Sequence, residues 1–352
     1  MATDTHEEQM DMLRKQAEAL RKGEKKERPL EISYGEALRE AISEEMARDP
    51  SIVFWGEGIS DGLFPLTAGL KDLFGADRIM DTPICEPTIT GSAIGAALGG
   101  LRPIATLMFN DFFYLSMGEL RQAAIWGWVH NRAGGMKLPI VYQAQYGGYA
   151  HQGSDHSSPT LAFYKHIPGL KVVVPNNPYD AKGLMKTAIR DNNPVIYLMH
   201  MTMYISKGPV PLEDYTIPFG VASVLREGTD VTVVGIGAQC MFALQAAEEL
   251  AKEGVSVEVI DPRTIEPLDM ETIVKSVRKT GRVVVVDEEW PACSVASEIG
   301  MLIMEQAFFH LQAPVKRVCG LPVPTPGSAT LEFAALPSAT TIAQGIREVL
   351  AV

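Results

Sequence analysis

One acidic side chain of this sequence stands where α/β proteins bind their ligands. Glu86 follows the strand-like segment RIMDTPIC, and none of the next thirteen residues carries a charge. Open α/β sheets bind ligands at the carboxyl ends of their strands. A carboxyl group in such apolar surroundings could share a proton with a ligand nitrogen. An alternative of equal weight is a carboxylate that only stabilises a helix N-terminus, with Pro87 at the first helical position.

A second candidate for proton transfer is His156. It lies in the polar segment GSDHSS, after the glycine-rich stretch YGGYAHQG. Histidine exchanges protons near neutral pH, but a histidine in a loop is more often only part of the surface. Residue types alone therefore favour Glu86 over His156.

The segment VVGIGAQC is similar to the G-x-G-x-x-G fingerprint of dinucleotide-binding proteins, because its two glycines lie between a predicted strand and a predicted helix. The third glycine of that fingerprint is replaced by Cys240. Tight strand-to-helix turns need glycine in any doubly wound fold, so we expect a structural turn here and no NAD site. Motifs for a P-loop, a zinc protease helix or a serine hydrolase elbow are absent from the sequence.

The candidates need a scaffold, and the sequence predicts an α/β fold. Apolar, β-branched segments such as SIVFWG, RPIATLMF and LKVVVP alternate with helix-like ones over residues 31–205, which is typical of a parallel sheet covered by helices. Residues 206–224 contain three prolines and no clear period, as expected of a linker, and a second, smaller alternating series fills residues 225–352. We therefore predict two doubly wound domains, preceded by a charged extension over residues 1–30. Ser33 and Glu36 predict a capping box for the first helix of the first domain.

Charge and composition exclude several classes of partner. The chain has 43 acidic and 31 basic residues, a formal charge of −12, which disfavours nucleic acids and anionic membranes. It contains no signal-peptide pattern and no apolar run of membrane-spanning length. Its four cysteines form no CxxC pair, so we expect a reducing compartment, by default the cytoplasm.

Several long stretches are more specific than a fold class. They include DTPICEPTITGSAIGAALGGLRPI, HIPGLKVVVPNNPYDAKGLMKTAIRDNNPVIYLMH and TGRVVVVDEEWPACS. From about residue 31 onward the chain resembles, in order and without large gaps, the beta subunits of thiamine-diphosphate-dependent 2-oxo acid dehydrogenases. The stretches LMFNDF, YTIPFG and DEEWPACSVASEI are most similar to acetoin dehydrogenase beta subunits. The resemblance implies an α₂β₂ heterotetramer whose beta chain supplies a pyrimidine-binding domain and a C-terminal transketolase-like domain.

The resemblance also implies roles for four residues. Glu86 would hydrogen-bond the aminopyrimidine ring of the cofactor, and Glu57 would lie near the same ring. Phe112 would stack on the pyrimidine, although residue type alone gives a core aromatic even odds. His156 would handle protons on the substrate-derived intermediate or the lipoyl group.

The chain also departs from the family pattern. Gly58 replaces a common acidic residue, and the usual H-S-Q stretch reads DHSS with an extra His151 nearby. These departures leave the substrate preference open.

Metal ions are implied by the resemblance in two places. Family members hold a potassium ion with main-chain carbonyls, which correspond here to Ile140, Ala188, Ile189, Asp191 and Asn193. The magnesium motif of thiamine-diphosphate enzymes is missing, since the nearest string is SDG at 60–62 with no asparagine at the required distance. The cofactor is therefore expected at an interface, where a partner alpha subunit supplies Mg²⁺ and the diphosphate contacts.

The function that follows is the beta half of a 2-oxo acid or acetoin dehydrogenase component. It would cleave a carbon–carbon bond of the substrate and pass the acyl fragment to a lipoyl group on an acyltransferase component. Two alternatives stay open: a thiamine-dependent decarboxylase or transketolase-like enzyme split over two chains, and a non-catalytic assembly subunit.

Overall fold

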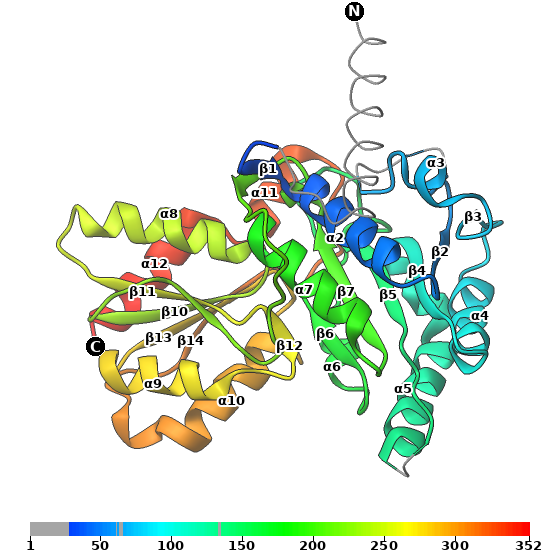
Figure 1. Ribbon diagram of the computed structural model, residues 1–352. Coiled ribbons are helices and arrows are strands. Elements are labelled where there is room, and N and C mark those ends of the chain that lie inside the picture. The colour runs from blue at the N-terminus through cyan, green and yellow to red at the C-terminus, as the bar shows by residue number, and fades with distance from the viewer. Residues whose placement is uncertain (1–27, 61, 63–65, 133–134) are drawn as a thin grey trace, which may run out of the picture.

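The larger of the two main sheets of the protein has seven strands. A computed structural model describes residues 28–60, 62, 66–132 and 135–352, and the predicted extension lies almost entirely outside them. The larger sheet has the order β12-β6-β7-β5-β4-β2-β3 (Figure 1). Its strands are β2 (Ile52–Gly56), β3 (Ile79–Asp81), β4 (Arg102–Phe109), β5 (Val141–Tyr146), β6 (Lys171–Val173), β7 (Val195–His200) and β12 (Thr264–Glu266). All pair in parallel except β12, which runs antiparallel to β6.

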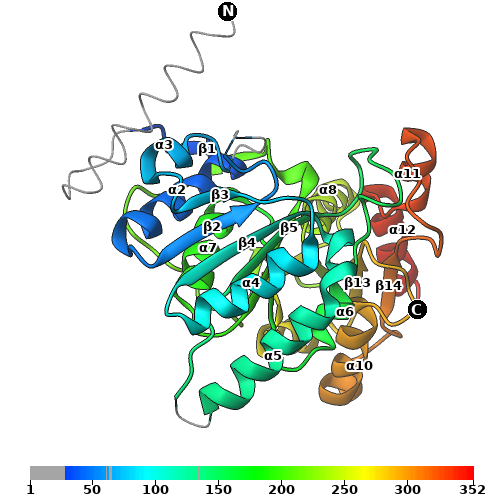
Figure 2. The same cartoon turned by 90° about the vertical axis from the view of Figure 1, so that its right-hand side faces the viewer.

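Helices cover both faces of this sheet. One face packs against α2 (Tyr34–Arg48) and α7 (Pro178–Arg190), and the other against α4 (Glu86–Leu98), α5 (Met117–Arg132) and α6 (Leu161–Lys165). Figure 2 shows α4 and α5 on the side that faces the viewer. Shorter elements are α3 (Leu70–Phe74) and the 3₁₀ helices η1 (Asn110–Ser116) and η2 (Met201–Met203).

The second sheet has five strands in the order β14-β13-β10-β11-β9. They are β9 (Ser223–Arg226), β10 (Val231–Gly235), β11 (Val257–Asp261), β13 (Val283–Asp287) and β14 (Lys316–Cys319), and only β9 is antiparallel. Helices α8 (Gln239–Ala251) and α12 (Ala339–Leu350) pack on one face, and α9 (Met270–Thr280) and α10 (Val295–Ala307) on the other. The remaining elements are η3 (Phe308–His310) and α11 (Ala329–Ala335). The predicted α/β class with two parallel sheets is confirmed.

The two halves of the chain share structure beyond what the sequence predicted. β12 leaves the second half to pair with β6, and one buried core joins side chains of both halves. The segment predicted as a linker is also partly regular, since β8 (Lys207–Pro209) pairs antiparallel with β1 (Glu31–Ser33). The periodicity of a sequence reports local burial, so it does not reveal short strands that stand outside the strand–helix alternation and pair with distant segments.

Local signals behave as expected at the first long helix. Ser33 accepts a hydrogen bond from the backbone of Glu36, whose side chain bonds the backbone of Ser33, so the predicted capping box is confirmed. The helix ends at Arg48, before Pro50. None of the helices that the structure describes is long and apolar enough to cross a membrane.

Candidate active site

The predicted site residues come from four neighbouring strands of the larger sheet. Glu57 follows β2, Glu86 follows β3, Phe112 follows β4, and His156 lies in the loop after β5. These strands are adjacent in the order β5-β4-β2-β3 and run parallel. Their carboxyl ends meet at one edge of the sheet, which is the edge where such sheets bind ligands.

Glu57 and Glu86 form a buried acidic pair at this edge. Their side chains are only 7% and 8% exposed. Burial, and then the charge of Glu86, raise the pKa of Glu57 above its usual value. Oε1 of Glu57 is buried and has no hydrogen-bond partner among the described residues. A buried acceptor without a partner is costly, so this oxygen is suited to a donor from a bound molecule or a water.

The local backbone determines the positions of Glu57 and Glu86 at the carboxyl edge of the sheet. A Cβ at Gly56 would lie 2.4 Å from the carbonyl oxygen of Thr106 on the next strand, so only glycine fits before Glu57. Glu86 is the first residue of α4 and is followed by Pro87, as the helix-terminus alternative also predicted. That alternative explains the position of Glu86 in the helix, but it gives no reason for burial beside a second carboxyl group.

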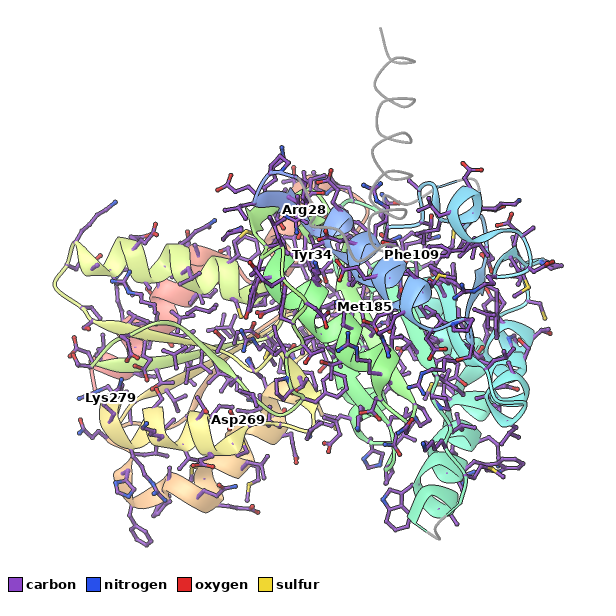
Figure 3. All side chains as sticks on the ribbon, in the orientation of Figure 1. Arg28, Tyr34, Phe109, Met185, Asp269 and Lys279 are labelled. Carbon is purple, nitrogen blue, oxygen red and sulfur yellow. The ribbon has the colours of Figure 1, made fainter. Side chains whose placement is uncertain are left out.

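His156 lies between aromatic rings. Its ring centroid is 4.6 Å from that of Phe109 and 5.4 Å from that of Phe112, edge-to-face in both cases. Phe109, labelled in Figure 3, ends β4, and Phe112 is in η1. The structure therefore brings together two residues that the sequence placed 44 positions apart, and adds Phe109, which sequence reasoning missed.

Polar contacts hold the loop of His156 against η1. Both carboxyl oxygens of Asp111 accept from the backbone of Ser158, and Asn110 donates to Ser158 and Thr160. Burial raises the pKa of Asp111, and the contacts with Ser158 and His156 oppose that rise. Asn110 and Asp111 stand in the stretch MFNDFF, which carried the family resemblance but no assigned role.

The second half of the chain also holds this loop. Glu288, after β13, accepts from the backbone of Gly148 and pairs with His200 at 2.8 Å. Glu332 of α11 accepts from the ring and the backbone of His151. Sequence reasoning missed both carboxylates, because contacts between residues 140 and 181 positions apart have no local pattern.

At least three of the five carbonyls predicted to hold potassium already accept hydrogen bonds. Arg102 donates to the carbonyls of Ile189 and Asp191, and the backbone of Val195 donates to that of Ile140. A carbonyl has two lone pairs, so these contacts leave room for a further ligand, and the potassium site stays a prediction. Within the described ranges, no group of three or more His, Cys, Asp or Glu side chains could hold a metal ion.

The glycines of VVGIGAQC have packing roles. A Cβ at Gly237 would lie 2.0 Å from the hydroxyl of Tyr146, and one at Gly235 would lie 2.9 Å from the backbone of Cys240. Gly235 is therefore required by the turn itself and Gly237 by the close approach of Tyr146 from the first half of the chain, in line with the structural interpretation.

Comparison with known proteins matches the chain to two families, one after the other along the sequence. Residues 31–205 match the family described as "Transketolase, pyrimidine binding domain", and residues 220–342 match "Transketolase, C-terminal domain". The chain is 43% identical over 332 residues to the acetoin:2,6-dichlorophenolindophenol oxidoreductase subunit beta of Cupriavidus necator, covering 91% of this chain and 97% of that one. It is 44% identical over 306 residues to the 2-oxoisovalerate dehydrogenase subunit beta of Bacillus subtilis, covering 86% and 93%. The chain belongs to the family of 2-oxo acid and acetoin dehydrogenase beta subunits.

Three further similar proteins are a dehydrogenase beta subunit and two transketolases of known structure. The pyruvate dehydrogenase E1 component subunit beta of Rickettsia felis is 42% identical, covering 91% of this chain and 98% of that one. A solved structure titled "Split gene transketolase, inactive beta4 tetramer" has a TM-score of 0.72 at 25% identity and covers 90% of this chain and 96% of its own. A transketolase from Leishmania mexicana has a TM-score of 0.68 at 16% identity, covers 95% of this chain and 49% of its own, and shows the fold alone.

The predicted family, fold and general function are thereby confirmed, and the names of the relatives favour a dehydrogenase beta subunit over the two alternatives. The identities to the acetoin, branched-chain and pyruvate relatives are nearly equal, at 43%, 44% and 42%. Identity therefore does not single out a substrate.

Proposed function

We propose that this chain forms a thiamine-diphosphate site together with an alpha subunit and cleaves a 2-oxo acid or acetoin. The observation that carries the proposal is the buried Glu57–Glu86 pair with its unpartnered oxygen at the carboxyl edge of the sheet. Two buried carboxyl groups, one with a free acceptor oxygen, suit a bound ring that donates hydrogen bonds. Thiamine diphosphate supplies, when bound, a carbon nucleophile that attacks the substrate carbonyl.

The residues of this chain would each do a simple task. Glu86 holds a proton at the ring nitrogen, which favours the tautomer that can act as a base. Glu57 offers its unpartnered Oε1 to a hydrogen-bond donor of the same bound molecule or of a water that links it to Glu86. Phe112 offers an aromatic face to the bound ring and packs edge-to-face with His156, and His156 exchanges a proton with the substrate-derived fragment.

An alpha subunit would cover the face next to Glu86. Large exposed apolar side chains lie next to Glu86 on the turn before α4 and, farther along the helices on this side of the sheet, at the end of α4 and just after it, on η1 and on α5. Exposed apolar side chains of this size are common at protein interfaces. They are Ile84, Leu98, Leu101, Tyr114, Leu115, Trp128 and Val129. In this proposal the alpha subunit supplies Mg²⁺ and the diphosphate contacts, and the pair works as an α₂β₂ heterotetramer. Potassium at the carbonyls around Arg102 is part of the same proposal.

A lipoyl-bearing acyltransferase component is proposed as the acceptor, and the cytoplasm as the location. The four cysteines are all unpaired, which suits a reducing compartment.

The decisive experiment compares Glu86→Gln with a matched control, Glu248→Gln, on the exposed surface of α8. Each beta chain is reconstituted with the alpha subunit, and turnover is measured with pyruvate, 2-oxoisovalerate and acetoin. We expect Glu86→Gln to keep the assembly and lose about 100-fold or more in kcat, because proton transfer contributes about 10²–10⁴-fold. The control should match the wild type. Near-normal turnover by Glu86→Gln would refute the proposed function.

A further inference from the structure

The loop after β5 contains a second histidine that the proposed function does not use. His151 precedes His156 by five residues and has a left-handed backbone conformation, with φ of 59°. A hydrogen bond from the backbone of His156 to the carbonyl of Gly153 closes a turn between the two. Both histidines therefore belong to one folded loop at the carboxyl edge of the sheet.

His151 is oriented by a buried carboxylate. Its Nδ1 lies 2.5 Å from Oε2 of Glu332, and its backbone N–H donates to the same oxygen at 3.1 Å. The side chain of Glu332 has no exposed surface, and the ring of Phe333 packs edge-to-face on the histidine at 5.5 Å. A positive φ is unfavourable for a histidine, so these contacts fix a conformation that the loop would otherwise avoid.

The other ring nitrogen of His151 is open. The side chain is 40% exposed, and Nε2 has no hydrogen-bond partner among the residues that the structure describes. Because a carboxylate only accepts, Nδ1 carries the proton and the lone pair of a neutral ring is at Nε2. A histidine with one nitrogen held by a buried carboxylate and the other free has the arrangement of a general base.

Acidic side chains from the second half of the chain surround the contact between His151 and Glu332. A Cβ at Gly148 would lie 3.1 Å from Oε1 of Glu332 and 3.3 Å from Oε1 of Glu288, so both carboxylates face this loop. Glu288 is paired with His200. The phenol of Tyr149 donates to the carbonyl of Pro337, and burial and then Glu288 raise its pKa, so it stays protonated. Oε1 of Glu332 has no hydrogen-bond partner among the described residues.

We propose that His151, held by Glu332, is a second acid–base residue of the active site, which exchanges one proton at Nε2 with an oxygen of the substrate. This inference rests on the proposed function. Only a proton moves: it passes from the substrate oxygen to Nε2 or back, while the proton on Nδ1 stays bonded to Glu332. Both substrate classes need such a transfer, because the carbonyl oxygen of a 2-oxo acid gains a proton when it is attacked, and the hydroxyl of acetoin loses one when its carbon–carbon bond breaks.

The first test uses His151→Asn, Glu332→Gln and the double variant, each reconstituted with the alpha subunit, with exposed His310→Asn as the matched control. We expect His151→Asn to lower kcat about 100-fold with a nearly unchanged KM, and to change the shape of the pH profile of kcat. Glu332→Gln should lower kcat at least about tenfold, and the double variant should be no worse than His151→Asn alone, because the two residues act as a unit. A normal kcat and pH profile for His151→Asn would overturn the inference. Should the role of Glu332 be only to fix the loop, Glu332→Gln would raise KM while His151→Asn stayed normal.

A second test needs no variant. Diethyl pyrocarbonate acylates free imidazole nitrogens, and fragment ions in mass spectrometry separate His151 from His156. In the wild-type complex we expect pyruvate or acetoin to slow the acylation of His151 and leave that of His310 unchanged. Equal rates with and without substrate would contradict the inference even when a variant fails to assemble. The proposed function fails separately, through normal turnover of Glu86→Gln.

Discussion

At the scale of single residues, the site depends on burying two carboxyl groups side by side. Burial and the neighbouring Glu86 raise the pKa of Glu57. An acid whose pKa is raised by folding binds its proton more tightly in the folded chain, so folding becomes less favourable as the pH rises above the unfolded value. Function and stability therefore compete at this position.

Glu57→Gln tests that competition. The variant should melt at a higher temperature than the wild type at pH 7.5, and the difference should shrink as the pH falls through about 4.3, the unfolded value, below which the carboxyl is protonated in both states. Its turnover with the alpha subunit should fall, because the polar environment of Glu86 changes. Calorimetry at both pH values measures the first effect and steady-state kinetics the second. A variant that is no more stable at pH 7.5 would show that the pair is not strained.

Much of the candidate site could be predicted at this scale, for a specific reason. Glu86 stands out because a lone charge follows a strand and precedes a long uncharged helix, and this pattern is local. Phe112 and His156 gained their roles only from the family resemblance, since aromatic and loop histidine residues are common in any fold. Glu288 and Glu332 could not be found, because only the folded chain brings them to the loop of His156.

At the scale of elements, the geometry of a strand end decides where Glu57 lies. Gly56 pairs with Thr106 across β2 and β4, and a Cβ there would meet both the carbonyl and the side chain of Thr106 at 2.4 Å. Real Cβ atoms do not approach so closely, so the end of β2 would have to move away from β4.

We therefore expect Gly56→Ala, which adds only one methyl group, to lower both stability and turnover. Overpacking of this kind costs about 1–3 kcal/mol and shifts the backbone that carries Glu57. Thermal unfolding should show the lost stability, and turnover should fall by a larger factor than in a control, Gly254→Ala. Gly254 has a positive φ but no atom within 4 Å of the added methyl, so it separates backbone strain from crowding. Equal activity of the two variants would argue against a role for the strand end.

Elements were predictable wherever their signals were local. The capping box of α2, the alternation of strands with helices, and the glycine turn after β10 follow from neighbouring residues. β12 and the β1–β8 pair did not, because they stand outside the alternation of strands with helices and are stabilised by distant partners.

At the scale of the whole molecule, buried acids lie where the two halves meet. Asp261 ends β11 and accepts a hydrogen bond from Asn176 of the first half at 2.7 Å. Burial, and then the charge of Asp180, raise its pKa to about 8. Since this pKa is raised by folding, stability falls as the pH rises from about 4, the unfolded value, through about 8.

Asp261→Asn should remove this part of the pH dependence. The melting temperature of the variant should exceed that of the wild type at pH 8, and the difference should shrink as the pH falls towards about 4. Differential scanning calorimetry of the reconstituted complex between these pH values gives the comparison. A wild type that is as stable as the variant at pH 8 would mean that Arg263, which faces Asp180 at 2.7 Å, already compensates the charge.

The crossing of β12 into the larger sheet constrains how such chains can be recombined. A chimaera joined near residue 220, between the two matched families, would take the edge strand of its first domain from the second parent. The strand β6 would then pair with a β12 from the other parent. Residues Thr264–Glu266 should therefore come from the same parent as the first domain, although they lie within the sequence of the second. Modular exchange in this family is therefore possible only for parents whose edge strands are interchangeable.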